Sequence, residues 1–272
     1  MSLRIKLRSA LRCSVFFSLI GVSLLECAFL FVTTRRSDLR KARANWLHRW
    51  CKVYERVLGI RSTRDGGVPL AGLLVSNHVS YLDIITIGAT APSVFVSKKE
   101  VRTWPVFGIC AQAAGTLFVD RERRGEVESV ATQMEEVLAQ GLLLVLFPEG
   151  TSSDGASVLP FKTSLFEPVA HLNFPAMGAA ISYTLEGGSV ADEICYWGEM
   201  TLAPHLLNVF SKPFVKATLR FGPARVRVGG RKAVARELYD EVALLHAGES
   251  MQEPLPINLG PRRVTLATAG AA

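Results

Sequence analysis

The sequence predicts an α/β fold in which a largely parallel sheet is flanked by helices. From residue 70 onward, short apolar runs alternate with longer amphipathic segments, as expected of strands that alternate with helices. Residues 142–147 read LLLVLF, which is typical of a strand buried on both faces of a parallel sheet. An apolar segment and then an amphipathic one precede this domain, so we expect an N-terminal membrane helix and an amphipathic helix before it.

The composition narrows the class of protein. The 272 residues are 49% hydrophobic with a net charge of +7, and a basic, apolar protein usually partners nucleic acid or anionic lipid. The aromatic and basic patterns of nucleic-acid-binding modules are absent from the sequence. The five cysteines are scattered, which indicates neither a zinc site nor a disulfide framework and favours reduced thiols in a cytoplasmic domain.

Residues 13–32 form an apolar run about 30 Å long as a helix, which matches the hydrocarbon core of a bilayer. Basic residues flank it, with a modest excess after it, so the positive-inside rule favours a cytoplasmic main domain. No small-residue cleavage site follows, which favours an uncleaved anchor over a signal peptide. A helix that crosses the bilayer and one that dips into a single leaflet fit equally well. Placing the Glu26 carboxylate in the hydrocarbon core costs free energy unless it is protonated, paired or near the interface.

Residues 39–60 predict an amphipathic helix, because Trp46, Trp50 and other apolar residues recur at helical spacing with Arg and Lys between them. Such a helix suits the headgroup region of a membrane, or it packs on the domain with a solvated charged face. We therefore expect membrane-anchoring helices at 1–60, the main domain at 61–247 and a disordered tail at 248–272.

The elements of the main domain are expected to follow a loop at 61–68, which is rich in Gly and charge. Strands are expected at 70–76, 93–97, 116–119, 142–147, 176–183 and 214–221. Helices are expected at 81–90, 104–114, 125–140, 203–210 and 231–246, with a further candidate at 162–172.

The stretch VSNHVSYLD holds His78 and Asp83 directly after the first of these strands. A neutral imidazole takes a proton from a hydroxyl near pH 7, and a carboxylate on its other nitrogen stabilises the imidazolium that forms. Residues five apart lie about 140° apart on a helix, so the pair meets only if His78 is in the turn and Asp83 in the following helix. The alternative is a helix start with Ser76 or Asn77 as its cap and an incidental histidine.

Other polar residues also follow strand ends. They are Lys98, Lys99, Asp120, Arg121, Glu149, Gly150, Thr151, Ser152 and, after the Gly/Ser loop, Lys162. Each group alone fits a turn, a surface ion pair or a solvated strand end. Because parallel strands end at one edge of a sheet, where α/β folds bind ligands, their convergence with His78 favours a site. The guanidinium of Arg121 at this edge is suited to binding a phosphate. Gly150 lets a ligand approach the backbone closely.

The segments NHVSYLD, KKEVRTWPVFGICAQAAGTLFVDR and FPEGTSS resemble, in order and spacing, the first three blocks of the glycerolipid acyltransferase family. The best-known members are 1-acyl-glycerol-3-phosphate acyltransferases. NFPAMGAAISY is loosely similar to the fourth block, in which Pro175 matches the proline. The blocks cover about residues 70–183, and the resemblance implies a glycerol-3-phosphate acyltransferase-like fold.

The resemblance implies direct acyl transfer from acyl-CoA or acyl-carrier protein to a lipid hydroxyl, without metal, cofactor or covalent acyl-enzyme. His78 would be the general base and Asp83 its orienting partner. The implied substrate-binding residues are Asn77, Lys98 (or its neighbour Lys99), Arg121, Glu149, Gly150 and Thr151. Arg121 and the lysine would bind a phosphate, and the FPEGT residues would position glycerol.

The favoured acceptor is the 2-hydroxyl of 1-acylglycerol 3-phosphate, which gives phosphatidic acid. A lyso-ornithine lipid, another lysophospholipid or glycerol 3-phosphate are the alternatives, and residues 193–213, outside the shared blocks, are candidates for making the choice. A membrane-tethered lipid-binding protein without catalysis is the remaining hypothesis. The oligomeric state stays open.

Overall fold

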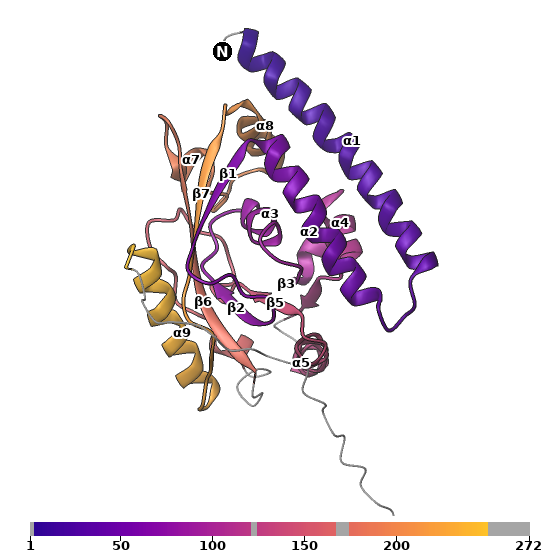
Figure 1. Cartoon of the computed structure of the whole chain (residues 1–272). Coiled ribbons are helices and arrows are strands. Elements are labelled where there is room, and N and C mark those ends of the chain that lie inside the picture. The colour runs from indigo at the N-terminus through magenta and orange to yellow at the C-terminus, as the bar shows by residue number, and fades with distance from the viewer. Residues whose placement is uncertain (1–2, 121–123, 167–173, 250–272) are drawn as a thin grey trace, which may run out of the picture.

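A computed structural model describes residues 3–120, 124–166 and 174–249 of the chain. One mixed sheet has the strand order β1-β7-β6-β2-β5-β3-β4, with β8 paired to β6 (Figure 1). The strands are β1 (Ile60–Asp65), β2 (Gly72–Ser76), β3 (Ser93–Lys98), β4 (Leu117–Val119), β5 (Leu143–Leu146), β6 (Pro175–Thr184), β7 (Val215–Phe221) and β8 (Arg225–Val226). The helices are α1 (Leu3–Thr33), α2 (Leu39–Leu58), α3 (Leu82–Gly88), α4 (Phe107–Ala114), α5 (Arg124–Ala139), α7 (Val190–Glu193), α8 (Leu202–Ser211), α9 (Arg231–His246) and the 3₁₀ turns η1 (Lys99–Thr103) and η2 (Thr163–Phe166).

The centre of the sheet is parallel, as the sequence predicts. Strand β2 pairs in parallel with both β5 and β6, and β3 pairs in parallel with β5 and β4. Strand β7 runs antiparallel to β6, and β1 lies parallel to β7 at the edge. The carboxyl ends of β2, β3, β4 and β5 therefore meet at one edge, where the polar clusters follow.

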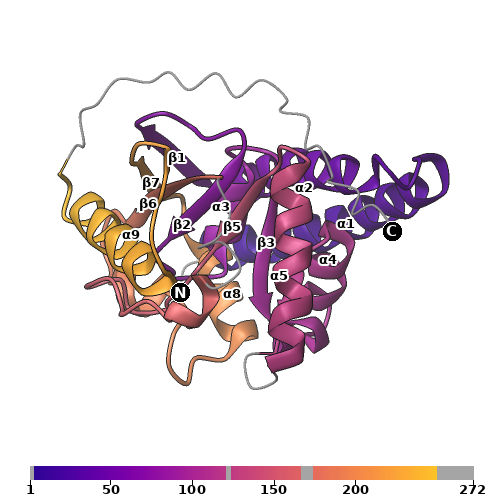
Figure 2. The ribbon, with the colours of Figure 1, turned by 90° about the horizontal axis from the view of Figure 1, so that it is seen from below.

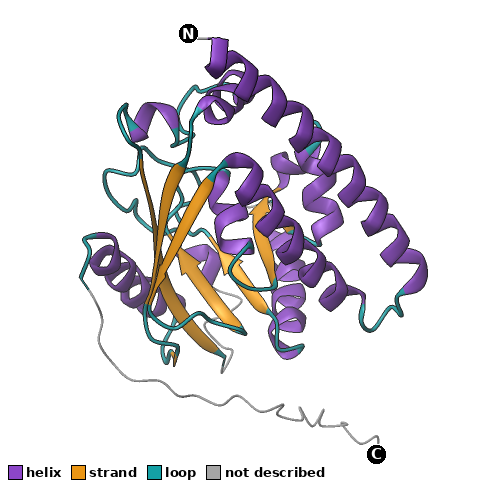
Figure 3. Cartoon of the chain, turned by 45° about the horizontal axis from the view of Figure 1, so that its top comes forward, coloured by secondary structure: helices purple, strands orange, loops and turns teal. Residues whose placement is uncertain are grey.

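Helices cover both faces of the sheet, which explains its fully apolar central strands (Figures 2 and 3). Leu74 and Val145 belong to a core cluster with residues of α2, α3 and α8. Leu73 and Val75 point the other way, into a cluster with residues of α5 and α9. Successive side chains of a strand alternate between faces, so both faces need apolar residues here.

Some expected elements differ from the structure. The prediction of a loop at 61–68 was wrong, because β1 occupies Ile60–Asp65. Among the described strands this edge strand pairs only with β7, and it is mostly exposed, so it lacks the apolar signal of an inner strand. The helix expected at 104–114 begins at Phe107, and the candidate at 162–172 is a 3₁₀ turn as far as Phe166. Residues 167–173 and most of the predicted tail lie outside the described residues.

The two N-terminal helices form an antiparallel pair against the domain (Figure 1). Helix α1 is long and apolar enough to cross a membrane. Phe16 and Ile20 of α1 are buried in the domain core, whereas Leu25 and Val32 are 74% and 85% exposed. Glu26 is paired, since Arg49 and the Trp50 indole of α2 both donate to its carboxylate. One face of α1 thus belongs to the fold and the other is apolar and uncovered.

Arginines fasten this pair to the ends of two domain helices. The Arg8 guanidinium donates to the Ser211 carbonyl at the end of α8, at 3.0 Å. The Arg43 guanidinium donates to the Ala113 carbonyl at the end of α4, at 2.7 Å. Cations at helix C-termini satisfy unpaired carbonyls and oppose the helix dipole. The orientation of the helix pair relative to the domain is therefore fixed by specific contacts.

Candidate active site

The site is built on the turn between β2 and α3. His78 lies in this turn and Asp83 is the second residue of α3, which is the arrangement that their spacing requires. The His78 Nδ1 and Asp83 Oδ2 atoms are 2.7 Å apart. The Asp83 side chain is fully buried, and that of His78 is 21% exposed. The imidazole is thus open to a ligand on one side and held by a buried carboxylate on the other.

The Asp83 carboxylate accepts several hydrogen bonds. Besides His78, the backbone N–H groups of Val79 and Ser80 donate to Oδ2, at 2.8 and 3.0 Å. The Tyr183 hydroxyl donates to Oδ1 at 2.9 Å. A carboxylate oxygen accepts hydrogen bonds, so Nδ1 of His78 carries the hydrogen and Nε2 presents its lone pair.

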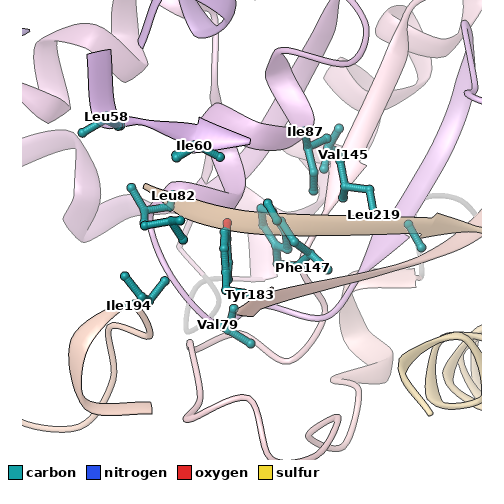
Figure 4. Packing of buried hydrophobic residues seen from close by; sticks show 14 of the residues in the cluster. Leu58, Ile60, Val79, Leu82, Ile87, Val145, Phe147, Tyr183, Ile194 and Leu219 are labelled. Carbon is teal, nitrogen blue, oxygen red and sulfur yellow. The ribbon is translucent and has the colours of Figure 1, made fainter. Parts of the chain in front are cut away.

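The His78 ring also packs against an aromatic side chain. It stacks on Phe147, just after β5, with ring centroids 4.2 Å apart and planes 19° apart. Because the carboxylate holds one edge of the imidazole and Phe147 covers one face, little freedom to rotate remains. Figure 4 shows Phe147 and Tyr183 beside Val79 in the same buried cluster.

Glu149 lies two residues beyond Phe147 and is only 2% exposed. Burial, with a smaller contribution from the charge of Asp83, raises the pKa of Glu149 to about 8. The backbone N–H groups of Leu159 and His78 face the carboxyl, yet within the described residues neither oxygen makes a hydrogen bond of normal geometry. A protonated Glu149 at neutral pH can donate a hydrogen bond as well as accept one.

The loop after Glu149 is hydrogen-bonded to the turn that carries His78. Gly150 has a φ of 74°, a conformation that glycine adopts without strain, and it allows the chain to turn immediately after the strand. The backbone N–H of Ser153 donates to the His78 carbonyl at 3.0 Å. Thr151 is exposed beside them. The FPEGTSS and NHVSYLD segments are therefore joined directly by a backbone hydrogen bond.

The predicted phosphate-binding cations are only partly described. Lys98 is exposed at the end of β3, and the neighbouring Lys99 pairs with Asp120 at 3.3 Å. Arg121 lies outside the described residues. Lys162 is exposed, and its backbone N–H donates to the Pro148 carbonyl at 2.8 Å. The role of these cations in binding stays a prediction.

Asn77 has a structural contact that its sequence position did not reveal. Its side-chain amide donates to the Ile181 carbonyl at 3.0 Å, and its oxygen accepts from the Ile181 N–H at 2.8 Å. Asn77 is 1% exposed, so both polar ends are occupied by β6. These contacts join the end of β2 to β6, and the role of Asn77 in substrate binding stays a prediction.

Two residues at the site were not singled out from the sequence. From the sequence, Tyr183 is predicted only to be the last residue of a buried strand. Tyr196 lies in the segment after α7, and its backbone N–H donates to the Val79 carbonyl at 2.8 Å, one residue from His78. The Tyr196 and Tyr81 rings meet edge to face, with centroids 5.5 Å apart. Both contacts join segments more than 90 residues apart, which local spacing does not encode.

A second histidine is buried close to these tyrosines. His205 Nε2 is 2.9 Å from the Cys195 carbonyl, and Nδ1 is 3.0 Å from the Tyr81 hydroxyl. A carbonyl only accepts, so Nε2 donates and Nδ1 accepts from Tyr81. Burial lowers the pKa of His205, which keeps this ring neutral. Both nitrogens of His205 are thus engaged in joining α8 to the site, whereas among the described residues Nε2 of His78 has no hydrogen-bond partner.

Comparisons with known proteins agree with this geometry. A family model described as Acyltransferase matches residues 65–182. A lyso-ornithine lipid O-acyltransferase of Brucella abortus (strain 2308) is 34% identical, over 87% of this chain and 93% of its own length. A protein of the same description from Rhizobium meliloti (strain 1021) is 36% identical, over 73% of each chain.

Other similar proteins have a different description. A 1-acyl-sn-glycerol-3-phosphate acyltransferase of Neisseria gonorrhoeae is 38% identical over 44% of this chain and 47% of its own. The crystal structure of the 1-acyl-sn-glycerophosphate (LPA) acyltransferase, PlsC, from Thermotoga maritima superposes with a TM-score of 0.64 at 19% identity, covering 90% of this chain and 95% of that one. The structural likeness shows a shared fold.

Proposed function

Because this chain belongs to the glycerolipid acyltransferase family, we propose that it transfers an acyl group from acyl-CoA or acyl-carrier protein to the hydroxyl of a lyso-ornithine lipid. The relatives of that description match along most of the chain, 87% of it for the Brucella abortus protein and 73% for the Rhizobium meliloti protein. This proposal changes the acceptor favoured by the sequence motifs and keeps the chemistry.

The second candidate acceptor is 1-acylglycerol 3-phosphate, with phosphatidic acid as product. The 38% identity with the Neisseria gonorrhoeae protein favours it, as does the FPEGT motif, but that match covers less than half of the chain. The two headgroups differ in charge. An ornithine headgroup presents an ammonium and a carboxylate, whereas a glycerol phosphate presents a phosphate alone.

Residues 193–213 are suited to distinguishing the acceptors. They lie beyond the matched 65–182, yet Tyr196 is bonded to the catalytic turn through Val79. The Ser152 hydroxyl donates to the Tyr196 carbonyl, which joins the segment to the FPEGTSS loop as well. A difference in this segment would thus act directly beside His78.

The His78–Asp83 pair is the observation that carries the proposed chemistry. His78 Nε2 takes the proton of the acceptor hydroxyl as its oxygen forms a bond to the thioester carbonyl carbon. The tetrahedral intermediate then collapses, the carbon–sulfur bond breaks, and the imidazolium returns its proton to the leaving thiolate. Asp83 stabilises the imidazolium while it exists. The step needs neither a nucleophilic side chain nor a cofactor.

The anchor brings this chemistry to a lipid substrate. The apolar residues on the outer face of α1 are Leu3, Leu7, Leu11, Val15, Phe17, Val22, Leu25, Phe29, Phe31 and Val32. Contacts with α8 near the start of α1 and with α4 near its end keep the helix along the domain. We therefore favour a helix lying in one leaflet over one that crosses the bilayer. The flanking basic residues favour the cytoplasmic side.

The test is acyl transfer by the purified protein in detergent and in vesicles, with labelled acyl-CoA and, in parallel, acyl-carrier protein. The acceptors are lyso-ornithine lipid, 1-acylglycerol 3-phosphate, a zwitterionic lysophospholipid and glycerol 3-phosphate. The proposal predicts the highest kcat/KM with lyso-ornithine lipid. A higher value with 1-acylglycerol 3-phosphate would support the second candidate, and no product from any acceptor with either donor would contradict acyl transfer.

A further inference from the structure

We propose that Tyr183 is a positioning residue that holds the Asp83 carboxylate toward His78 and limits the basicity of the pair. The proposal deepens the proposed function and rests on it for the catalytic consequence alone. Tyr183 is the second-to-last residue of β6, the strand beside β2, and is 6% exposed. Its hydroxyl is the only group outside the catalytic turn that donates to Asp83 among the hydrogen bonds of the described residues.

The direction of the hydrogen bond follows from chemistry. An ionised carboxylate only accepts, so the Tyr183 hydrogen is committed to Asp83 Oδ1. The Tyr183 oxygen then accepts from the Thr86 hydroxyl at 3.5 Å. Burial and the charge of Asp83 raise the pKa of Tyr183, so the hydroxyl stays protonated at neutral pH.

The four hydrogen-bond donors to the Asp83 carboxylate come from two parts of the fold. Three of them, from His78, Val79 and Ser80, act on Oδ2 and come from the turn. Tyr183 alone acts on Oδ1 and comes from β6. Because both oxygens are hydrogen-bonded, the carboxylate of Asp83 resists rotation about the Cβ–Cγ bond. Tyr183 also takes up part of the negative charge that would otherwise act on the imidazolium.

Other titratable groups also face the pair. Glu149 follows β5, and Cys195 lies after α7. Burial raises the pKa of Glu149 to about 8 and that of the Cys195 thiol to about 12. Both groups are neutral over the acidic side of the pH profile. A change on that side in a Tyr183 variant therefore reports on the His78–Asp83 pair.

Tyr183→Phe keeps the ring and removes the hydroxyl. Asp83 then retains its three donors on Oδ2 while Oδ1 is buried without a partner, so the carboxylate binds the imidazolium more tightly. We expect the titration midpoint of His78 to rise by roughly 0.5 to 1 pH unit. The acid limb of kcat/KM should move by the same amount, with kcat at pH 7 reduced roughly 3- to 30-fold and the KM of the acceptor nearly unchanged.

Tyr239→Phe is the matched control. Its hydroxyl donates to the Val158 carbonyl at 3.4 Å, and its ring packs in the cluster on the opposite face of the sheet. This variant loses the same atom without touching Asp83. We expect its pH profile and its His78 titration to match those of the wild type.

The titration is measured by NMR on protein labelled with ¹⁵N-histidine, with the His78 signal assigned by its loss in His78→Gln. An upward shift in Tyr183→Phe but not in Tyr239→Phe supports the proposal. An unshifted midpoint, or an activity loss that is equal at every pH, overturns it and leaves Tyr183 a packing residue. Because the titration needs no substrate, it is decisive even if the acceptor panel contradicts the proposed function.

Discussion

Glu149→Gln should make the protein more stable at alkaline pH. The ordinary pKa of glutamate is about 4.5, and burial raises that of Glu149 to about 8 in the folded state. Between these values the folded state binds a proton that the unfolded state has released, so stability falls as the pH rises from about 4.5 to about 8. Below this range Glu149 is neutral in both states and costs nothing.

The size of the effect follows from the pKa difference. Each pKa unit corresponds to about 1.4 kcal/mol, so a difference of about 3.5 gives about 5 kcal/mol, with a range of about 3 to 6 kcal/mol. A domain of this size shifts its Tm by about 2 to 4 °C per kcal/mol, which corresponds to roughly 10 to 20 °C. Glutamine is a neutral residue of the same shape, so the variant should escape this loss.

The assay is thermal unfolding of both proteins in one detergent at several pH values from about 4.5 to about 8.5. We expect equal Tm values at the acidic end and a progressively higher Tm for Glu149→Gln toward pH 8.5. Glu135→Gln, at an exposed position on α5, is the control and should follow the wild type. A Tm difference that stays constant across the range would refute the reasoning, since it would not depend on ionisation of Glu149.

Further predictions concern the base, the acceptor and the anchor. Asp83→Asn should lower kcat by roughly 10²- to 10⁴-fold with little change in KM, because the imidazole loses the anion that fixes its tautomer. Steady-state kinetics would measure this effect, and a loss of kcat below tenfold would count against the His78–Asp83 pair. Tyr196→Ala should alter the KM ratio between lyso-ornithine lipid and 1-acylglycerol 3-phosphate by at least about threefold, and an unchanged ratio would exclude it from acceptor choice. Leu25→Arg on the outer face of α1 should weaken vesicle flotation without lowering Tm, whereas unaltered flotation would argue against membrane contact by that face.

The sequence predicted the parts of the fold that depend on local pattern. Strands β2, β3 and β5 are apolar and short, and α9 has the amphipathic spacing and the bounds expected of it. Parallel pairing of those strands was enough to bring His78 and the FPEGTSS loop to one edge. Strand β1 was missed because its residues are mostly polar and exposed and pair with β7, more than 150 residues away.

For the site as well, the sequence predicted the contacts that depend on local spacing. His78 and Asp83 are close in sequence, and their spacing restricts how they meet. Tyr183 reaches Asp83 from a strand 100 residues later, and Tyr196 reaches Val79 from still farther away. Asn77 follows β2 as expected, but the nitrogen and the oxygen of its side chain both form hydrogen bonds with the Ile181 backbone in β6. Contacts between distant segments depend on strand order and helix placement, which local spacing leaves undetermined.

The central claim is direct acyl transfer with His78 as the general base. The most direct test combines His78→Ala with the wild type in a rapid-quench experiment, using labelled acyl-CoA and the best acceptor. We predict that kcat falls by at least about 10³-fold in a variant that keeps the wild-type Tm, and that no label becomes attached to the wild-type protein during turnover. Activity within tenfold of the wild type, or a labelled acyl-protein that forms and decays at the rate of turnover, would contradict the account.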